Sequence, residues 1–191
     1  MNRNYWRREN IRIRAFEEKD IEIHTRTRNE PDSVQQFYYS HIHQPQAKEE
    51  LEKELKKGQE ENSADNKKIF VIETLDEKYV GEVLIWFVDQ RNRYFRYGIF
   101  INSKFRRKGY GKEALIIILD YYFNELNYNK CSPTVYSFNE ASQMFHESFG
   151  FVKEGVLRNE LFTRGKYFDM YYYGMLRDEF NSRYEHFINI S

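Results

Sequence analysis

The chain has 191 residues, a length that fits one domain of ordinary size. Its 30 lysines and arginines are balanced by 30 aspartates and glutamates, which argues against a protein that mainly coats nucleic acid or an anionic membrane. Aromatic residues make up 18% of the chain, enough to build a core despite the 31% of charged residues, so we expect one folded domain over residues 1–191.

The N-terminal part of the chain predicts a strand followed by a helix. Ile11 and Ile13 alternate with arginines, which is the period of a half-buried strand. Asp20 is the expected N-cap of a helix that carries Ile21 and Ile23.

A polar stretch and three strands follow. Lysines and glutamates alternate after Pro45, which predicts an exposed amphipathic helix that ends near Gly58. Residues 69–72, 79–88 and 93–101 then read as strands joined by short polar turns, so we expect an antiparallel meander.

The pattern changes after residue 101, where a basic loop with two glycines leads into helices and strands. The expected elements are a helix over 112–127, a strand over 134–138, a helix over 139–149, and strands over 151–162 and 167–176 with a turn at 164–166. An antiparallel meander followed by β-α-β-α-β-β is a mixed α/β fold.

The compartment is inferred from what the sequence lacks. Cys131 is the only cysteine, so it has no intramolecular disulfide partner, and we expect it to be chemically inert. The charged N-terminus is unlike a signal peptide, and the longest apolar run, residues 114–119, is too short to span a bilayer. These features predict a cytoplasmic protein without a membrane partner.

The basic loop is the clearest local asymmetry in this balanced chain. No acidic residue lies between Asp89 and Glu113. The basic residues between them are Arg91, Arg93, Arg96, Lys104, Arg106, Arg107, Lys108 and Lys112. Gly109 and Gly111 allow the backbone to approach a ligand, and the helix that follows presents free N–H groups, so the loop favours a phosphate.

Two common phosphate-binding classes do not fit this loop. A Walker A motif needs a serine or threonine to hold Mg²⁺ where this chain has Glu113. A Rossmann fingerprint matches at Gly109, Gly111 and Ala114, but the acid that should bind the ribose is missing at the expected spacing, and the motif follows a meander instead of opening the sheet.

A third class fits. The loop Arg106-x-x-Gly109-x-Gly111 resembles the Arg/Gln-x-x-Gly-x-Gly/Ala loop of the GNAT family of N-acetyltransferases, which cradles the pyrophosphate of coenzyme A. Downstream, residues 139–151 resemble the Asn-x-x-(Ala/Ser)…Tyr-x-x-x-Gly-Phe segment of the same family.

Further segments place the resemblance within the family. Residues 13–20, 154–158 and 165–169 are similar to the branch of ribosomal-protein N-terminal and spermidine acetyltransferases. The resemblance therefore covers nearly the whole chain. It implies a GNAT fold, with a mixed central sheet of about seven strands flanked by helices.

The resemblance also implies a ligand and a site. Acetyl-CoA would be the cosubstrate, no metal is implied, and the amine would attack the thioester directly, without an acyl-enzyme. The backbone of residues 97–101 would hold the pantetheine and the thioester carbonyl. The expected coenzyme A contacts are Ile99, Phe100, Ile101, Arg106, Arg107, Lys108, Gly109, Tyr110, Gly111, Lys112, Asn139, Ser142 and His146.

The chain departs from the family pattern at one catalytic position. His146 stands four residues before Gly150, where family members commonly have a tyrosine that protonates the departing thiolate. An imidazole titrates near ~6.5 and a thiol near ~8.5, so we expect His146 to protonate the thiolate or to hydrogen-bond it. Ser142 lies one helical turn earlier, on the same face.

A base for the attacking amine is less clearly marked. Glu82, on the strand beside the coenzyme A strand, is the first candidate and Glu160 the second, and a water chain that ends at either would serve equally well. The acidic residues Glu17, Glu18, Asp20, Glu22, Glu30 and Asp32 either attract a polyamine or form an ordinary exposed helix face. A polyamine, a protein N-terminus and an aminoglycoside all stay open as substrates.

Two other functional classes compete with the enzyme. The loss of the family tyrosine would suit a coenzyme A-binding regulatory or scaffold protein without turnover. RNA binding by the basic aromatic stretch 91–110 is disfavoured by the net charge and by the lack of RNP-type motifs, so no nucleic-acid partner is expected. The strand with tyrosines at 171–173 and the aromatic tail predict a homodimer.

Overall fold

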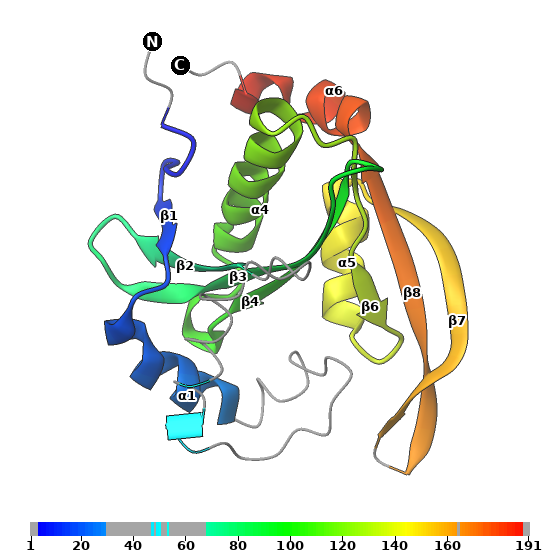
Figure 1. Cartoon of the computed structure of the whole chain (residues 1–191), viewed down its shortest axis with the longest axis horizontal. Coiled ribbons are helices and arrows are strands. Elements are labelled where there is room, and N and C mark those ends of the chain that lie inside the picture. Colours follow the sequence, from blue (N-terminus) through cyan, green and yellow to red (C-terminus); the bar gives the residue numbers. More distant parts are fainter. Residues whose placement is uncertain are drawn as a thin grey trace.

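A computed structural model describes residues 4–29, 47, 49–50, 53, 68–163 and 165–188 (Figure 1). Its strands are β1 Ile11–Ala15, β2 Lys68–Thr74, β3 Tyr79–Asp89, β4 Tyr94–Ile101, β5 Lys130–Cys131, β6 Thr134–Tyr136, β7 Val152–Thr163 and β8 Lys166–Leu176. Its α-helices are α1 Ile21–Asn29, α4 Tyr110–Asp120, α5 Glu140–Phe149 and α6 Arg177–Ile188. Short 3₁₀ turns span Glu18–Asp20 and Ser103–Phe105, and a π-helical turn, Tyr121–Glu125, extends α4.

The predicted antiparallel meander is confirmed. β1 pairs with β2, β2 with β3 and β3 with β4, each pair antiparallel. At Gly81 the backbones of β3 and β4 lie so close together that an added Cβ would collide with the backbone oxygen of Phe100 on β4. The meander therefore brings the start of β3 directly beside the end of β4.

The second half of the sheet diverges from the first. β5 is short and pairs in parallel with β4 only at Tyr94 and Phe95. It also pairs with β8, which in turn pairs with β6 and β7. Eight strands thus form one sheet in the order β1-β2-β3-β4-β5-β8-β6, with β7 on β8, where about seven were expected. Among the described residues, positions 96–101 of β4 pair with β3 alone.

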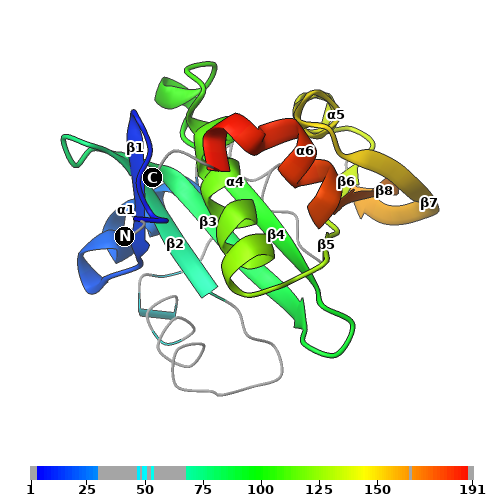
Figure 2. The same cartoon turned by 90° about the horizontal axis from the view of Figure 1, so that it is seen from above.

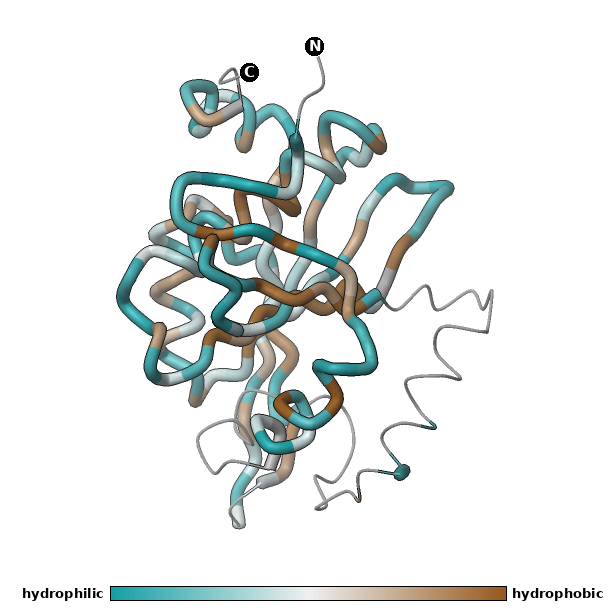
Figure 3. The backbone as a smooth tube through the Cα atoms, turned by 90° about the vertical axis from the view of Figure 1, so that its left-hand side faces the viewer, coloured by the Kyte–Doolittle hydropathy of each residue, from teal (hydrophilic) through white to brown (hydrophobic). Residues whose placement is uncertain are grey.

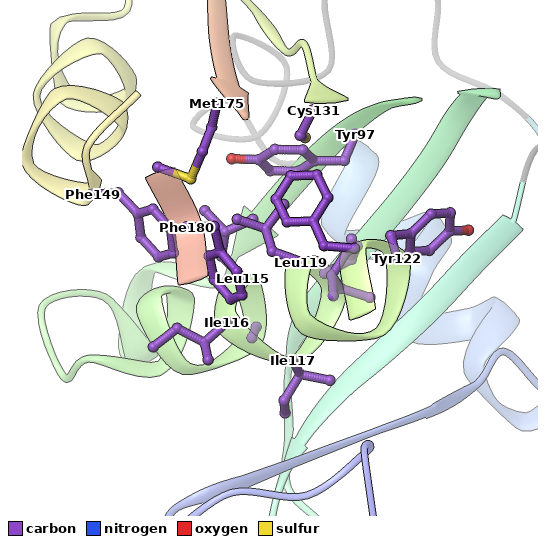
Figure 4. Close-up of a cluster of buried hydrophobic side chains, with 14 of the residues drawn as sticks. Tyr97, Leu115, Ile116, Ile117, Leu119, Tyr122, Cys131, Phe149, Met175 and Phe180 are labelled. Atoms are coloured by element: carbon purple, nitrogen blue, oxygen red, sulfur yellow. The ribbon is translucent and has the colours of Figure 1, made fainter. Parts of the chain in front are cut away.

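The core lies between the sheet and the helices on one of its faces. The α4 helix is buried from Ala114 to Asp120 and crosses the face of β2–β4 opposite α1 (Figure 1). It lies next to α6 (Figure 2). Leu115 of α4, Phe149 of α5 and Met175 of β8 converge in one apolar layer (Figure 4). Apolar stretches run through the middle of the molecule, and turns between strands are hydrophilic (Figure 3).

Several expected elements differ in detail. The helix expected over 112–127 begins at Tyr110, because Gly109 already supplies its N-cap, and ends in the π-helical turn. Neither β5 nor α6 was expected from the sequence pattern. The amphipathic helix expected between Pro45 and Gly58 lies outside the described residues, apart from isolated positions.

The expected role of Asp20 is wrong. It does not cap α1 but ends the 3₁₀ turn before that helix, and its carboxylate accepts a hydrogen bond from the Glu17 N–H (2.9 Å). The guanidinium of Arg14 donates to the same carboxylate through both terminal nitrogens (2.6 and 2.8 Å). Burial opposes ionisation of Asp20, but these hydrogen bonds outweigh it, so the pKa of Asp20 is lowered.

Candidate active site

The basic loop adopts a conformation that depends on glycine at one position. Gly109 caps α4 with φ +83°, in the left-handed region, and an added Cβ would meet no atom within 4 Å. Arg107, two residues earlier, also has a positive φ of 64°. The first-turn N–H groups of any α-helix lack intrahelical acceptors, so this turn presents donors beside an open space at Gly109.

Arg106 anchors the loop and leaves one donor unsatisfied. Its Nε donates to the carbonyl of Ile101, the last residue of β4, at 2.9 Å. Its Nη2 is buried and has no hydrogen-bond partner in the described part of the chain. A buried cationic donor without an acceptor is costly, so this atom fits an anionic ligand. The next acidic residue along the chain, Glu113, has its carboxylate engaged by Asn10.

The loop meets the second motif at Gly111. A Cβ built there would lie 3.6 Å from Cγ1 of Ile101 and 3.7 Å from Cε2 of Phe145 on α5. These are ordinary contact distances, so alanine fits this position, as the Gly/Ala alternative of the motif allows. The loop therefore lies close to both the end of β4 and α5.

The end of β4 directs backbone groups toward the diverging strands. The carbonyl of Phe95 accepts from the Ser132 N–H (2.8 Å), on the side away from β3. Because backbone groups alternate sides along a strand, residues 97, 99 and 101 point the same way. The Ile101 carbonyl confirms this, since it is the acceptor of Arg106. The sheet thus diverges along residues 97–101, the segment whose backbone is expected from the family resemblance to hold the thioester.

The α5 helix gathers the downstream motif residues. Asn139 is its N-cap, and its side-chain oxygen accepts from the Ser142 N–H at 3.1 Å. Gly150 ends the helix with φ +113°, as a glycine C-cap should. His146, one turn after Ser142, is 4% exposed and lies against the ring of Tyr173.

His146 is neutral, and its single ring N–H donates a hydrogen bond within the protein. Its Nδ1 lies 2.7 Å from the backbone carbonyl of Ser142, which can only accept, so Nδ1 carries the hydrogen. Its Nε2 then accepts from the Tyr97 hydroxyl at 2.9 Å. Burial lowers the pKa of His146 to about 4. The structure therefore disfavours the imidazolium donor considered from the sequence, and Tyr97 is a site residue that sequence reasoning missed.

The two candidate bases lie in very different surroundings. Glu82 on β3 is buried, and its carboxylate accepts hydrogen bonds from Nδ1 of His24 (2.7 Å) and the hydroxyl of Tyr79 (2.7 Å). Glu160 is exposed on β7, which pairs with β8 in the described structure. Glu82 is the neighbour of Phe100 on β4, so only Glu82 lies beside the coenzyme A strand.

The other residues proposed from the sequence differ in exposure and in their partners. Arg107 and Lys108 are exposed on the loop. Burial raises the pKa of the Cys131 thiol, which agrees with an inert role. Of the acidic residues, Glu17, Glu18 and Glu22 are exposed, Asp20 is paired with Arg14, and positions 30 and 32 lie outside the described residues. The described part of the chain contains no group of three or more His, Cys, Asp or Glu that could hold a metal ion.

Comparison with known proteins decides the family. Residues 10–152 match the model of the acetyltransferase (GNAT) domain family. The chain belongs to the GNAT acetyltransferase family.

Full-length relatives agree with this acetyltransferase assignment. The chain is 35% identical over 180 residues to the SPbeta prophage-derived uncharacterized N-acetyltransferase YokL of Bacillus subtilis, covering 92% of this chain and 95% of that protein. It is 26% identical over 176 residues to spermidine N(1)-acetyltransferase of Vibrio cholerae, covering 92% and 98%. The acetyltransferase therefore transfers an acetyl group to an amine, and these comparisons give no support to the regulatory alternative.

A solved structure shows the same fold. The crystal structure of spermidine N-acetyltransferase from Vibrio cholerae in complex with CoA and spermine superposes with a TM-score of 0.79 at 25% identity, covering 89% of this chain and 97% of that one. The α/β fold with an open mixed sheet is thus the GNAT fold. Among the helices that the structure describes, none is long and apolar enough to cross a membrane.

Proposed function

We propose that this acetyltransferase uses acetyl-CoA to acetylate a primary amine of a polyamine. One observation carries the proposal: the glycine loop lies close to both the diverging end of β4 and the α5 helix. A Cβ added at Gly111 would contact both Ile101 and Phe145, and Nε of Arg106 donates to the carbonyl of the same Ile101. A phosphate-binding turn and the part of β4 that diverges from β5 are thus fixed relative to each other.

Each part has a distinct task. Arg106 and the N–H groups of the first turn of α4 bind the pyrophosphate, with Arg107, Lys108 and Lys112 as a surrounding basic rim. Asn139 and Ser142 lie at the N-terminus of α5, beside the pantetheine arm. Acetyl-CoA, when bound, supplies the thioester that is attacked. Backbone N–H groups of residues 97–101 stabilise the charge that develops on the thioester oxygen.

The proposed role of His146 is to position Tyr97. Because His146 is neutral at physiological pH, it has no second proton to give, and its Nε2 holds the Tyr97 hydroxyl by accepting from it. The Tyr97 side chain lies at the diverging end of β4. His146→Ala therefore lowers kcat more than it weakens acetyl-CoA binding, and a kcat equal to that of the wild type would contradict any role of His146 in turnover.

A polyamine is the proposed acceptor for two reasons. The Vibrio cholerae relatives with this fold are named for spermidine and one is complexed with spermine. In addition, Glu18 and Glu22 are exposed near the N-terminus of α1 and give that end of the helix a negative field for a cationic chain, while Glu17 is paired with Lys19. A polyamine carries several positive charges, so this field attracts it more strongly than it attracts the single charge of a peptide N-terminus.

A thiol-release assay with acetyl-CoA and a panel of amines tests the function. Spermidine and spermine should give the highest kcat/KM, above an N-terminal peptide and an aminoglycoside. Acetyl-CoA binding without turnover on any amine would contradict the proposal. Arg106→Ala should raise the acetyl-CoA Kd by about tenfold or more, since a charged hydrogen bond contributes about 1.5–3 kcal/mol. Gly109→Ala should also weaken acetyl-CoA binding, because alanine strains the left-handed turn that presents the N–H groups.

Matched controls separate the loop from general surface effects. Arg91→Ala removes an exposed arginine in the β3–β4 turn, and Gly155→Ala changes a glycine whose added Cβ would meet nothing within 4 Å. Both should leave the acetyl-CoA Kd within twofold of the wild type. Equal weakening by the loop and control variants would show that the loop does not hold the phosphates.

We further propose a cytoplasmic homodimer. The strand that carries Tyr172 is paired on both edges, by β6 and β7, so it offers no free edge for a partner. The β7–β8 hairpin instead exposes the apolar residues Val152, Val156, Leu157, Phe162 and Tyr167. Light scattering after size exclusion should give twice the monomer mass, and a monomeric mass for Phe162→Lys would place the contact on this hairpin.

A further inference from the structure

A second buried histidine lies on the α1 side of the sheet, outside the family motifs. His24 comes from α1 and is 3% exposed. Its Nδ1 lies 2.7 Å from both carboxylate oxygens of Glu82, and the ring of Phe16 packs edge-on against it at 5.4 Å. A carboxylate accepts, so Nδ1 carries the hydrogen. This pair, His24 with Glu82, is the His24–Glu82 dyad.

The other nitrogen of the His24 ring is left open. Nε2 is buried and finds no hydrogen-bond partner among the residues that the structure describes. An unsatisfied buried polar atom costs about 1–3 kcal/mol, so native structures rarely retain one without a reason. With the hydrogen held on Nδ1, the lone pair of Nε2 is available to take a proton. An oriented imidazole with a free lone pair, backed by a carboxylate, is the arrangement of a general base.

The dyad lies next to the proposed reaction centre. Glu82 is the cross-strand neighbour of Phe100 on β4, and neighbouring strands are about 4.8 Å apart. Its side chain and that of Phe100 face α1, while Val83 and Ile99 face the core beneath α4. The dyad therefore lies on the α1 side of the sheet, one strand away from the backbone segment that is proposed to hold the thioester.

We infer that His24 is the general base of the acetyl transfer, with Glu82 as the residue that orients it; this inference rests on the proposed function. It changes the role considered for Glu82 from the sequence, where the carboxylate itself was the base. The Glu82 oxygens are already occupied by His24 and Tyr79, whereas Nε2 of His24 is free to accept.

Two protons leave the substrate ammonium during the reaction, and each has a defined acceptor. A substrate ammonium with a pKa near about 10 gives one proton to Nε2 of His24, through at most one water, and the imidazolium is stabilised by Glu82. The neutral nitrogen then forms the C–N bond to the acetyl carbon while the C–S bond breaks. The second nitrogen proton goes to the departing sulfur, and His24 releases its proton to solvent after the products leave.

Two variants test the dyad by kinetics. His24→Gln should lower kcat/KM by about 10²-fold at neutral pH and remove the acidic limb of the pH–rate profile that the imidazole produces. Glu82→Gln keeps an acceptor for Nδ1 but removes the charge, so the limb should move to lower pH. Acetyl-CoA affinity should stay within twofold in both, because neither residue belongs to the loop.

Other ionisable groups near the dyad are Tyr79 on β3 and Asp20 and Arg14 beside α1. Burial, followed by the nearby Glu82 charge, raises the pKa of Tyr79, and Arg14 keeps Asp20 ionised, so neither titrates between pH 5 and 8. A limb in this range that disappears in His24→Gln therefore belongs to His24.

A control variant and a spectroscopic readout complete the test. His186→Gln makes the same change at an exposed histidine on α6 and should leave the rate and the pH profile unchanged. Without any substrate, ¹⁵N NMR of the imidazole should show His24 protonated at Nδ1 and unprotonated at Nε2 at pH 8. A proton on Nε2 in the neutral form, or His24→Gln with the wild-type rate and profile, would overturn the inference.

Failure of the proposed function looks different. It appears in the wild-type chain as a lack of acetyl transfer to every amine of the panel, before any variant is made. Failure of the dyad alone appears as an active wild-type enzyme whose rate and pH profile do not depend on His24.

Discussion

Two buried histidines of this acetyltransferase have almost the same exposure and opposite chemical settings. His24 is 3% exposed and His146 is 4% exposed. The Nδ1 of His24 donates to a carboxylate, whereas the Nδ1 of His146 donates to a backbone carbonyl. The Nε2 of His146 accepts from Tyr97, whereas the Nε2 of His24 has no partner in the described structure.

The difference shows that burial alone does not decide what a histidine does. Burial disfavours the imidazolium in both places. At His146 no charge compensates, and the pKa falls to about 4, so the ring serves as a neutral link between α5 and β4. At His24 the Glu82 carboxylate offers a compensating charge, so the ring is able to take a proton and return it. The motif position marked His146, but the chemistry favours His24.

The largest expected effect comes from removal of the carboxylate. Glu82→Ala leaves two donors, Nδ1 of His24 and the Tyr79 hydroxyl, without their acceptor, and each unsatisfied buried donor typically costs about 1–3 kcal/mol. Urea unfolding at pH 7.5 measures this loss. Glu147→Ala is the control: its carboxylate accepts from the Tyr173 hydroxyl but is exposed, so the loss should stay near about 1 kcal/mol. Equal losses would contradict the distinction.

The pH dependence of stability tests the neutral state of His146. Its pKa in the folded protein, about 4, lies below the ordinary value of 6.5, so the unfolded chain binds a proton that the folded chain does not. Stability is therefore full above pH 6.5 and falls as the pH is lowered, by about 2 kcal/mol between pH 6.5 and 5.

The control is the same titration without the imidazole. His146→Gln should flatten the stability profile between pH 6.5 and 5 relative to the wild type. The pKa values of Asp20 and Glu73 are lowered by their arginine partners against the effect of burial, so these carboxylates reduce stability only at lower pH. Parallel profiles for wild type and His146→Gln would show that His146 is not held neutral.

The contrast between the histidines also shows which features of the fold and site could be predicted from the sequence. The Arg106–Gly111 loop, the cap at Asn139 and the meander were predictable, because each depends on local spacing and capping chemistry. The neutral state of His146 was not, since it depends on burial of the ring by other parts of the fold, including β4, whose Tyr97 lies 49 residues away in the chain.

His24 left only a weak signal in the sequence. Ile21, His24 and Thr27 are spaced three apart on α1 and are all buried, so a polar residue occupies the inner stripe of that helix. Such a stripe predicts a buried partner but does not name it. The partner, Glu82, is 58 residues away, and only the packing of α1 against β3 brings the two together.

A smaller effect is expected when Tyr97 loses its hydroxyl. Tyr97→Phe leaves Nε2 of His146 without a donor, as Nε2 of His24 is now, and should reduce the free energy of unfolding by about 1 kcal/mol. Tyr167→Phe, at an exposed tyrosine, should cost less than half of that. The open nitrogen alone should not make His146 a base: ¹⁵N NMR should still show its ring neutral at pH 6, because no carboxylate faces it. A protonated His146 ring in Tyr97→Phe would show that a buried histidine here needs no carboxylate partner to take up a proton.

The smallest effect concerns the other donor to Glu82. The Tyr79 hydroxyl donates to Oε1 of this carboxylate at 2.7 Å and so competes with His24 for its charge. In Tyr79→Phe the negative charge of Glu82 is left to the imidazolium, which should stabilise the protonated form of His24. The acidic limb of the pH–rate profile should then move to higher pH, opposite to its movement in Glu82→Gln. Because both variants alter the same carboxylate, shifts in the same direction would mean that Glu82 acts on the rate through the structure of α1 and not through the charge that it offers to His24.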